Sequence, residues 1–208
     1  MLKFLIKKGN VDMNTTNLKG QNALYFAVYA NHINSARVLI NKGIQISDTL
    51  LLLAIEKGYN EMAKILITEG VDLDKVHSAA FLQSAVLNRN EDVAITLIEH
   101  NANSDIRTDG GNSLLHYIAS FGLLKTFKAL LKHRECDVNI TNNRGETPLM
   151  YALSCDKADR IEVVKTFLNA GANVNARDDH GDSALMKCVR KDDKALVEVL
   201  VNNGADIT

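Results

Sequence analysis

The stretch Gly145-Glu-Thr-Pro-Leu-Met-Tyr-Ala152 decides the fold, because it predicts the start of a short packed helix. Thr147 offers a hydroxyl that can cap the helix, and Pro148 stands in the first turn, where a missing N–H breaks no intrahelical bond. Leu149 and Ala152 then lie three residues apart on one helical face. The small alanine allows a neighbouring helix to approach closely, so this face is predicted to be buried.

The same pattern recurs along the chain at a nearly constant interval. Its leucine is found at Leu24, Leu51, Leu82, Leu115, Leu149 and Leu185, in steps of 27, 31, 33, 34 and 36 residues. A second pattern keeps the same interval, with an apolar pair that precedes a glycine and a polar–apolar alternation, as in Phe167-Leu-Asn-Ala-Gly-Ala-Asn-Val-Asn175. Two patterns in step over the whole chain predict a repeat protein.

Each repeat is predicted to contain a second helix and a loop. In the stretch 161–170, apolar residues at positions 161, 163, 164, 167 and 168 form a helical stripe. Gly171 follows as a left-handed C-cap, and Asn101 can take the same role in an earlier repeat because asparagine tolerates that backbone conformation. The unit is therefore helix, turn, helix and loop.

These residues resemble the ankyrin repeat, whose pattern has a turn glycine, then Thr-Pro-Leu-His-x-Ala, and ends in Gly-Ala-Asp-Val-Asn. The motif histidine is present only as His116. The resemblance implies an all-α solenoid of stacked helix–turn–helix units with short hairpin tips, and a His116 ring hydrogen-bonded to a neighbouring loop. It divides a single domain, residues 1–208, into a partial repeat 1–14 and repeats 15–47, 48–74, 75–105, 106–139, 140–175 and 176–208.

Two departures from the pattern predict local changes. About six residues are missing before Thr49, so the hairpin tip there is expected to be stunted. The segment 154–160 carries extra residues and is expected to protrude as a loop. Residues 1–14 correspond to a second helix without its first, which predicts either more chain upstream or a divergent N-terminal cap.

Composition argues against several classes of partner. The chain has 208 residues, 46% of them hydrophobic, and 24 basic against 25 acidic side chains. Near-zero net charge disfavours nucleic acid and anionic membranes as partners. The most apolar run, residues 50–55, is far shorter than the about 20 residues of a membrane span. Three scattered cysteines predict free thiols in a reducing compartment, the cytoplasm, or a host cytosol if the chain is a secreted pathogen effector.

No pattern of residues predicts catalysis, a cofactor or a metal site. Cys155 and Cys188 stand beside or at the small-residue position of their repeats and are interpreted as packing residues. His133 and Cys136 supply only half of a tetrahedral zinc site. Phosphate-binding glycine loops are absent from the sequence. We therefore predict a protein that is not an enzyme.

By the family pattern, the residues that vary and contact partners lie in the hairpin tips and late in the first helices. Mapped onto this chain, they predict a partner-binding set of Lys19, Gln21, Tyr29, Lys57, Asn88, Asn112, Phe121, Arg144, Glu146, Asp179, His180 and Arg190. Aromatic and arginine side chains are typical binding anchors, which singles out Tyr29, Phe121, Arg144 and Arg190.

The sequence thus predicts a monomeric, non-catalytic scaffold that binds another protein through a concave face of tips and first helices. Two alternatives stay open. The chain could be a dedicated inhibitor or immunity protein that blocks one enzyme, or a targeting and adaptor segment of a larger protein such as a pathogen effector.

Overall fold

A computed structural model describes residues 12–71, 73, 78–133, 136–155 and 159–207. In these ranges the regular structure is helical, apart from two isolated antiparallel bridges, Arg107 with Ser113 and Arg177 with Ser183. The chain divides into two compact units, Met1–Asn103 (unit 1) and Ser104–Thr208 (unit 2).

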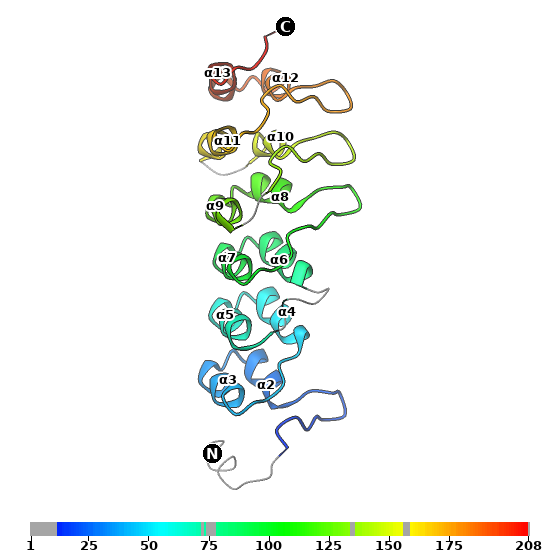
Figure 1. Ribbon diagram of the computed structural model, residues 1–208, viewed down its shortest axis with the longest axis vertical. Coiled ribbons are helices and arrows are strands. Elements are labelled where there is room, and N and C mark those ends of the chain that lie inside the picture. The colour runs from blue at the N-terminus through cyan, green and yellow to red at the C-terminus, as the bar shows by residue number, and fades with distance from the viewer. Residues whose placement is uncertain (1–11, 72, 74–77, 134–135, 156–158, 208) are drawn as a thin grey trace. The chain divides into compact units, whose positions relative to one another are not determined.

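Unit 1 stacks helix pairs in two layers. Its helices are α2 (Ala23–Tyr29), α3 (Ile33–Ile40), α4 (Asp48–Glu56), α5 (Asn60–Glu69), α6 (Ser78–Leu87) and α7 (Glu91–Glu99). The first helices α2, α4 and α6 pack in one row, and α3, α5 and α7 pack in a second row beside them, on the left in Figure 1.

Unit 2 repeats this arrangement. Its helices are α8 (Leu114–Phe121), α9 (Leu124–His133), α10 (Pro148–Ala152), α11 (Arg160–Asn169), α12 (Ala184–Arg190) and α13 (Lys194–Asn202). The first helices α8, α10 and α12 carry the hairpins that precede them, while α9, α11 and α13 form the layer farther from the hairpins (Figure 1). The predicted all-α stack of helix pairs is thereby confirmed within each unit.

The recurring leucines form the core, as the period predicts. All six are buried, from Leu24 with 0% of its surface exposed to Leu185 with 7%. In unit 2 the second layer adds Phe127 of α9 and Phe167 of α11, whose rings stack with centroids 4.1 Å apart and no exposed surface. Burial of such side chains contributes about 1.5–3 kcal/mol each. The repeat register therefore follows the leucine spacing.

Local chemistry explains several helix starts and ends, but not the start of α10 at Thr147. The Ser183 side chain accepts a hydrogen bond from the Met186 amide, and Asn101 and Gly171 end their helices with φ of 61° and 91°. The prediction that the Thr147 hydroxyl caps its helix is wrong, because no described residue bonds this buried oxygen. The extended backbone at Thr147 and the fixed φ of Pro148 start α10 without it.

The hairpin tips are closed by one repeated device. In each of three tips, a side-chain oxygen accepts two backbone N–H groups, two and four residues later, at distances of 2.9–3.0 Å. The residues that supply it are Asn17, Asn142 and Asp178. Where residues are missing before Thr49, a four-residue connection, 44–47, leads directly into α4 in place of a hairpin. The inserted loop 154–160 lies partly outside the described residues.

Neighbouring hairpins of unit 2 touch at a glycine. Gly145 has φ of 70°, and a Cβ there would come within 2.6 Å of Asp179 Oδ1 and 2.9 Å of the Asp179 amide nitrogen. Gly181 has a similar φ of 78°, but a Cβ would meet no described atom within 4 Å. Only glycine therefore fits at 145 without displacing the next hairpin.

We expect Gly145→Ala to lower the free energy of unfolding by about 2–4 kcal/mol, because left-handed backbone strain adds to the clash. The matched change Gly181→Ala should lower the free energy of unfolding by about 1–2 kcal/mol, because it adds the backbone strain without the clash. Urea unfolding followed by circular dichroism measures both, and equal losses would contradict the hairpin contact.

Candidate partner-binding groove

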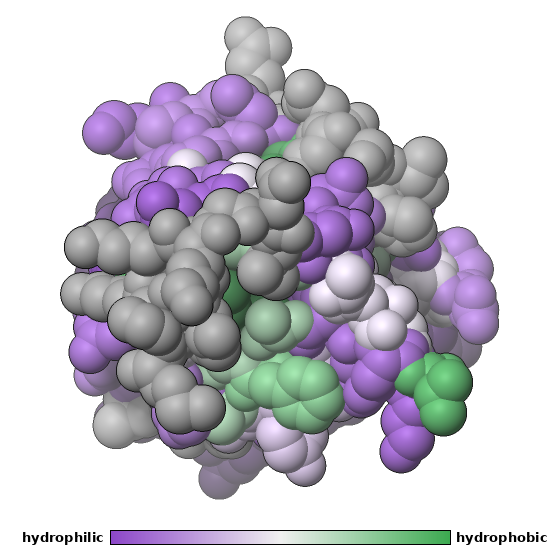
Figure 2. All heavy atoms as spheres, turned by 90° about the horizontal axis from the view of Figure 1, so that it is seen from below, coloured by the Kyte–Doolittle hydropathy of each residue, from purple (hydrophilic) through white to green (hydrophobic). Residues whose placement is uncertain are grey.

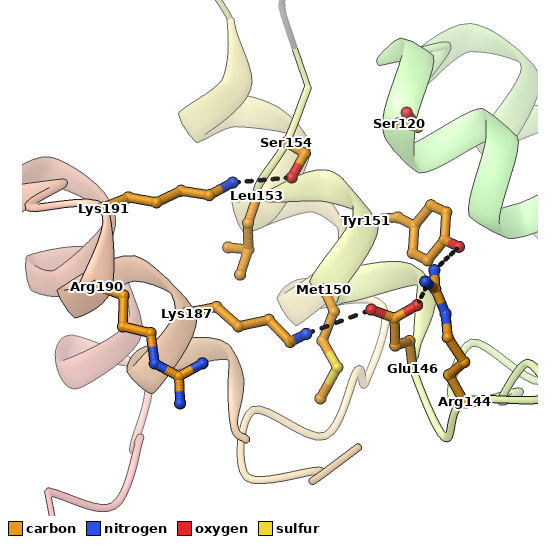
Figure 3. Close-up of a pocket in the computed structure, with 10 residues that line it drawn as sticks. All are labelled: Ser120, Arg144, Glu146, Met150, Tyr151, Leu153, Ser154, Lys187, Arg190 and Lys191. Carbon is orange, nitrogen blue, oxygen red and sulfur yellow. Dashed lines mark hydrogen bonds and ion pairs between the residues drawn. The ribbon is translucent and has the colours of Figure 1, made fainter. Parts of the chain in front are cut away.

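A groove of about 420 Å³ opens on the hairpin side of unit 2. The residues that line it come from the tip at 142–146, the end of α8, α10 with the residues after it, and the end of α12 (Figure 3). They are Ser120, Arg144, Glu146, Met150, Tyr151, Leu153, Ser154, Lys187, Arg190 and Lys191. The floor is apolar, since Met150 and Leu153 are buried, and the walls are polar.

A buried amide organises one wall of the groove. Asn142 Nδ2 lies 2.8 Å from Asn112 Oδ1, 3.1 Å from Glu146 Oε2 and 3.1 Å from the Tyr151 hydroxyl. The Tyr151 hydroxyl in turn donates to Asn112 Oδ1 at 3.0 Å. A satisfied, partly buried network of this kind holds its members in one geometry. Asn142 therefore fixes both Glu146 and Tyr151 at the groove.

His116 is buried behind the same wall and contacts both Glu146 and Tyr151. Its Nε2 lies 2.9 Å from the carbonyl oxygen of Glu146, and its Nδ1 accepts a hydrogen bond from the Ser113 amide at 3.1 Å. Its ring meets Tyr151 edge-on at 5.0 Å. Burial lowers the pKa of His116, so the neutral ring is favoured. The predicted bond from this histidine to a neighbouring loop is confirmed.

Glu146 is the charged centre of the groove. Its carboxylate lies 2.7 Å from Arg144 Nη2 and 3.3 Å from Lys187 Nζ. Desolvation acts to raise the pKa of Glu146, but hydrogen bonds from Asn142 and Lys187 and the charge of Arg144 outweigh it and hold the pKa below its usual value. Glu146 is therefore ionised and bridges a hairpin cation to an α12 cation.

Lys187 is held from two repeats. Its ammonium group lies 2.7 Å from Asp178 Oδ2 as well as 3.3 Å from Glu146 Oε1. Desolvation acts to lower the pKa of Lys187, but its hydrogen bonds to Asp178 and Glu146 raise it above the usual value. The pKa of Asp178 is lowered: the hydrogen bond from Lys187 and the two tip amides overcome the effect of burial. Lys187 thus joins the tips of successive repeats.

The last cations of the groove sit at the end of α12. Arg190 makes a two-pronged ion pair with Asp182, and Lys191 Nζ donates to Ser154 Oγ at 3.1 Å. The Asp182 side chain is 13% exposed, against 64% for Arg190. The acid thus lies beneath the guanidinium group and orients it toward solvent.

The Lys187 bridge is expected to make the stability of the protein depend on pH in the acid range. Both carboxylates it joins have depressed pKa values, so their contribution is complete above their unfolded pKa values and is lost as pH falls through the folded ones. We expect Lys187→Met to lower the free energy of unfolding by about 2 kcal/mol near neutral pH. The deficit should shrink below about pH 4 as the carboxylates protonate. Urea unfolding as a function of pH measures this, and a constant deficit would contradict the bridge.

The structure gathers part of the predicted partner-binding set in this groove. Arg144, Glu146 and Arg190 line it, and Asn112 lies in the network behind Tyr151. Asp179 and His180 are exposed on the next hairpin tip. Phe121 is half-buried, with its ring 6.3 Å from that of Tyr117, and does not belong to the lining.

Of the predicted residues of unit 1, Tyr29 and Lys57 are neighbours, and the others belong to other elements. Tyr29 is 53% exposed, and Lys57 Nζ lies 5.5 Å from the centre of its ring. Lys19 and Gln21 belong to the tip that Asn17 closes, and Asn88 Nδ2 donates to the Ser84 carbonyl at 2.9 Å. Contact of these residues with a partner stays a prediction.

Unit 1 carries a second, more apolar hollow of about 350 Å³ between α2 and α3. Phe26 and Tyr29 line it, and each is 53% exposed. Figure 2 shows hydrophobic surface at this end of the chain. The partial repeat 1–14 that the sequence predicts beside it lies almost wholly outside the described residues.

Sequence reasoning missed Tyr151 and Lys187 as members of the groove. A signal for Lys187 was available, because it precedes Arg190 by three residues and Lys191 by four and so shares a helical face with them. Tyr151 carried no comparable signal. Its place depends on the buried bonds to Asn112 and Asn142, which join two repeats.

Other reactive side chains have packing roles. Cys155 and Cys188 are buried, and desolvation raises the pKa of Cys188 to about 11, which disfavours the nucleophilic thiolate. Among the described residues, no group of His, Cys, Asp and Glu is arranged to hold a metal ion. In the same residues no helix has the length and hydrophobicity needed to cross a bilayer.

Comparison with known families agrees with this geometry. A family model described as "Ankyrin repeats (3 copies)" matches residues 82–178 and 115–208, and one described as "Ankyrin repeats (many copies)" matches residues 1–40. The chain belongs to the ankyrin repeat family. A crystal structure of the ankyrin repeat protein EF0377 superposes with a TM-score of 0.74 at 20% identity and covers 95% of this chain and 100% of that one.

Curated relatives share the repeats over part of their length. The chain is 28% identical to potassium channel AKT2/3 of Arabidopsis thaliana over 67% of this chain and 21% of that protein. It is 25% identical to putative ankyrin repeat protein FPV222 of Fowlpox virus over 86% and 24%. It is 31% identical to neurogenic locus notch homolog protein 1 of Mus musculus over 64% and 5%. This ankyrin chain therefore spans about a quarter or less of these relatives. Ankyrin repeats in general are non-enzymatic modules for protein–protein interaction.

Proposed function

We propose that this ankyrin chain binds a partner protein through the groove of unit 2 and the hairpin tips beside it. The observation that carries the proposal is the pair of exposed arginines, Arg144 and Arg190, each held by a recessed carboxylate. Arginine is enriched among residues that dominate binding energy. Side chains that are already ordered lose less conformational entropy when a partner binds.

The proposed role is presentation of a fixed surface rather than catalysis. The partly buried network of Asn112, Asn142 and Tyr151 fixes one wall, and the Lys187 bridge fixes the other. A standard interface buries about 800 Å² on each partner, more than the groove alone offers. The exposed tip residues Asp179 and His180 extend the proposed surface.

We further propose that the protein works as a monomer, with no nucleic acid or membrane as its ligand, in a reducing compartment such as the cytoplasm. Support comes from the net charge of −1 and from the free thiols of Cys136, Cys155 and Cys188. Roles as an enzyme inhibitor, or as an adaptor segment of a pathogen effector, stay predictions from the sequence.

The test uses a matched pair of double variants in the full chain. Arg144→Ala with Arg190→Ala removes the two exposed arginines of the groove, while Lys128→Ala with Lys165→Ala removes two exposed cations from α9 and α11 in the other layer. Captured proteins from a lysate of the source cells are quantified by mass spectrometry. We expect a partner that is lost with the groove variant and kept with the control. Equal recovery with both variants would overturn the proposed site.

A further inference from the structure

We propose that the groove of unit 2 recognises an acidic segment of the partner protein, with Asp or Glu carboxylates on Arg144 and on the Arg190–Lys191 pair. This inference rests on the proposed function and adds the chemistry of the partner. It starts from an asymmetry in the groove, whose lining contains four cationic side chains and one carboxylate.

The acids at the groove are recessed and its arginines are exposed, while Lys187 is 24% exposed between them. The side chains of Asp178, Asp182 and Glu146 are 1%, 13% and 16% exposed, while those of Arg144 and Arg190 are 67% and 64% exposed. An approaching partner therefore meets the arginine cations first, even though each ion pair has no net charge. The surface field of such a patch favours an anionic ligand.

The arginines keep donors for a ligand. A guanidinium group has five N–H donors in a planar fork. Each terminal nitrogen of Arg190 donates one N–H to an oxygen of Asp182, so each of these nitrogens retains a second N–H. Arg144 directs Nη2 to Glu146 and to the Tyr151 hydroxyl, which leaves its other nitrogens for a ligand. A planar fork matches a carboxylate in two-point geometry.

The spacing of the cations suggests the form of the segment. Arg144 lies in the hairpin tip 142–146 and Arg190 at the end of α12, in successive repeats. Packed helices of successive repeats lie about 8–10 Å apart, and we take this repeat spacing as the span between the two cations. An extended peptide advances about 3.3 Å per residue. Two acidic residues about three positions apart would therefore reach both cations, and the residues between them would face Met150 and Leu153 on the floor.

Glu146 favours a carboxylate over a phosphate group. It lies between Arg144 and Lys187 and carries a full negative charge at neutral pH, which repels a phosphate dianion more strongly than a singly charged carboxylate. We therefore commit to unmodified acidic residues, and a phosphorylated segment becomes an outcome of the test.

The experiment measures binding of the full chain to an array of short synthetic peptides that vary in charge and spacing. Each peptide with two glutamates is matched by one with glutamines and one with phosphoserines in the same places. We expect the glutamate peptides to bind at least about tenfold more tightly than the glutamine peptides, as for close charge pairs at interfaces. The preference should peak near a three-residue separation and weaken with added salt.

Variants assign the preference to the groove. Arg190→Gln with Lys191→Gln should abolish it, while Lys128→Gln with Lys165→Gln, which removes the same charge from the other layer, should leave it intact. Circular dichroism checks that both variants fold. The predicted weakening of peptide binding by salt is measured on the unmodified chain, so it tests the inference even if a variant fails to fold.

Three outcomes would overturn the inference: equal binding of glutamate and glutamine peptides, a strict requirement for phosphoserine, or a preference that survives the groove variant. If acidic peptides show no preference but the captured partner is still lost with the Arg144→Ala and Arg190→Ala variant, the proposed function stands and this inference alone fails.

Discussion

Leu149→Asp is expected to lower the free energy of unfolding by about 4 kcal/mol or more, enough to unfold part of unit 2. Leu149 is 1% exposed in α10, which packs against α8, α11 and α12. A carboxylate at this buried position would lose its hydration. Because each repeat is stabilised by its neighbours, the loss should spread to the adjacent helix pairs.

The control for this change is the same substitution on the other layer. Leu131 of α9 is 40% exposed, so Leu131→Asp leaves the new charge in water and should cost about 0.5 kcal/mol, mainly through the helix C-terminus. Thermal unfolding followed by circular dichroism compares the two variants. An unchanged midpoint for Leu149→Asp would show that the repeat register is wrong.

His116→Ala is expected to lower the free energy of unfolding by about 3 kcal/mol, through a cavity and unpaired buried groups. It would leave the Ser113 amide and the Glu146 carbonyl without the ring and remove the edge contact to Tyr151. His180→Ala, an exposed histidine on a tip, is the matched control and should change stability by less than about 0.5 kcal/mol.

The same histidine gives a pH signature. Burial lowers the folded pKa of His116 below 6.5, so the unfolded chain binds the proton more readily. The contribution of His116 is complete above about pH 6.5 and is lost as pH falls toward the folded pKa. His116→Gln, which can donate and accept at the same places, should flatten the stability profile in this interval. A profile identical to that of the unmodified chain would contradict the neutral buried ring.

The fold could be predicted because repetition multiplies a weak local signal. A single Thr-Pro-Leu stretch is ambiguous, but Leu24 to Leu185 recur in step with the second pattern, and every such leucine is buried. The role of His116 followed from its motif position. The Thr147 cap was mispredicted because the preference of threonine for helix starts shows that its hydroxyl is able to cap the helix. It does not show that the hydrogen bond forms at this position.

The site was harder to predict because a repeat pattern does not indicate how deeply each surface side chain is buried. Glu146 and Arg144 occupy neighbouring surface positions in the family pattern, yet their side chains are 16% and 67% exposed. The difference arises from Asn142 and Lys187, which draw the carboxylate inward from two repeats. Phe121 is likewise half-buried beside Tyr117. The contact between Glu146 and Lys187 joins side chains 41 residues apart, beyond the reach of local propensity, whereas Asn142 and Tyr117 each lie four residues from their partners.

Hydrogen–deuterium exchange of the full chain, with and without its captured partner, tests the central claim most directly. Partner binding at the groove predicts added protection at the tip 142–146, in α10 and at the end of α12, with little change in α9 and α11. Protection confined to α9, α11 and α13, or none in unit 2, would contradict the account.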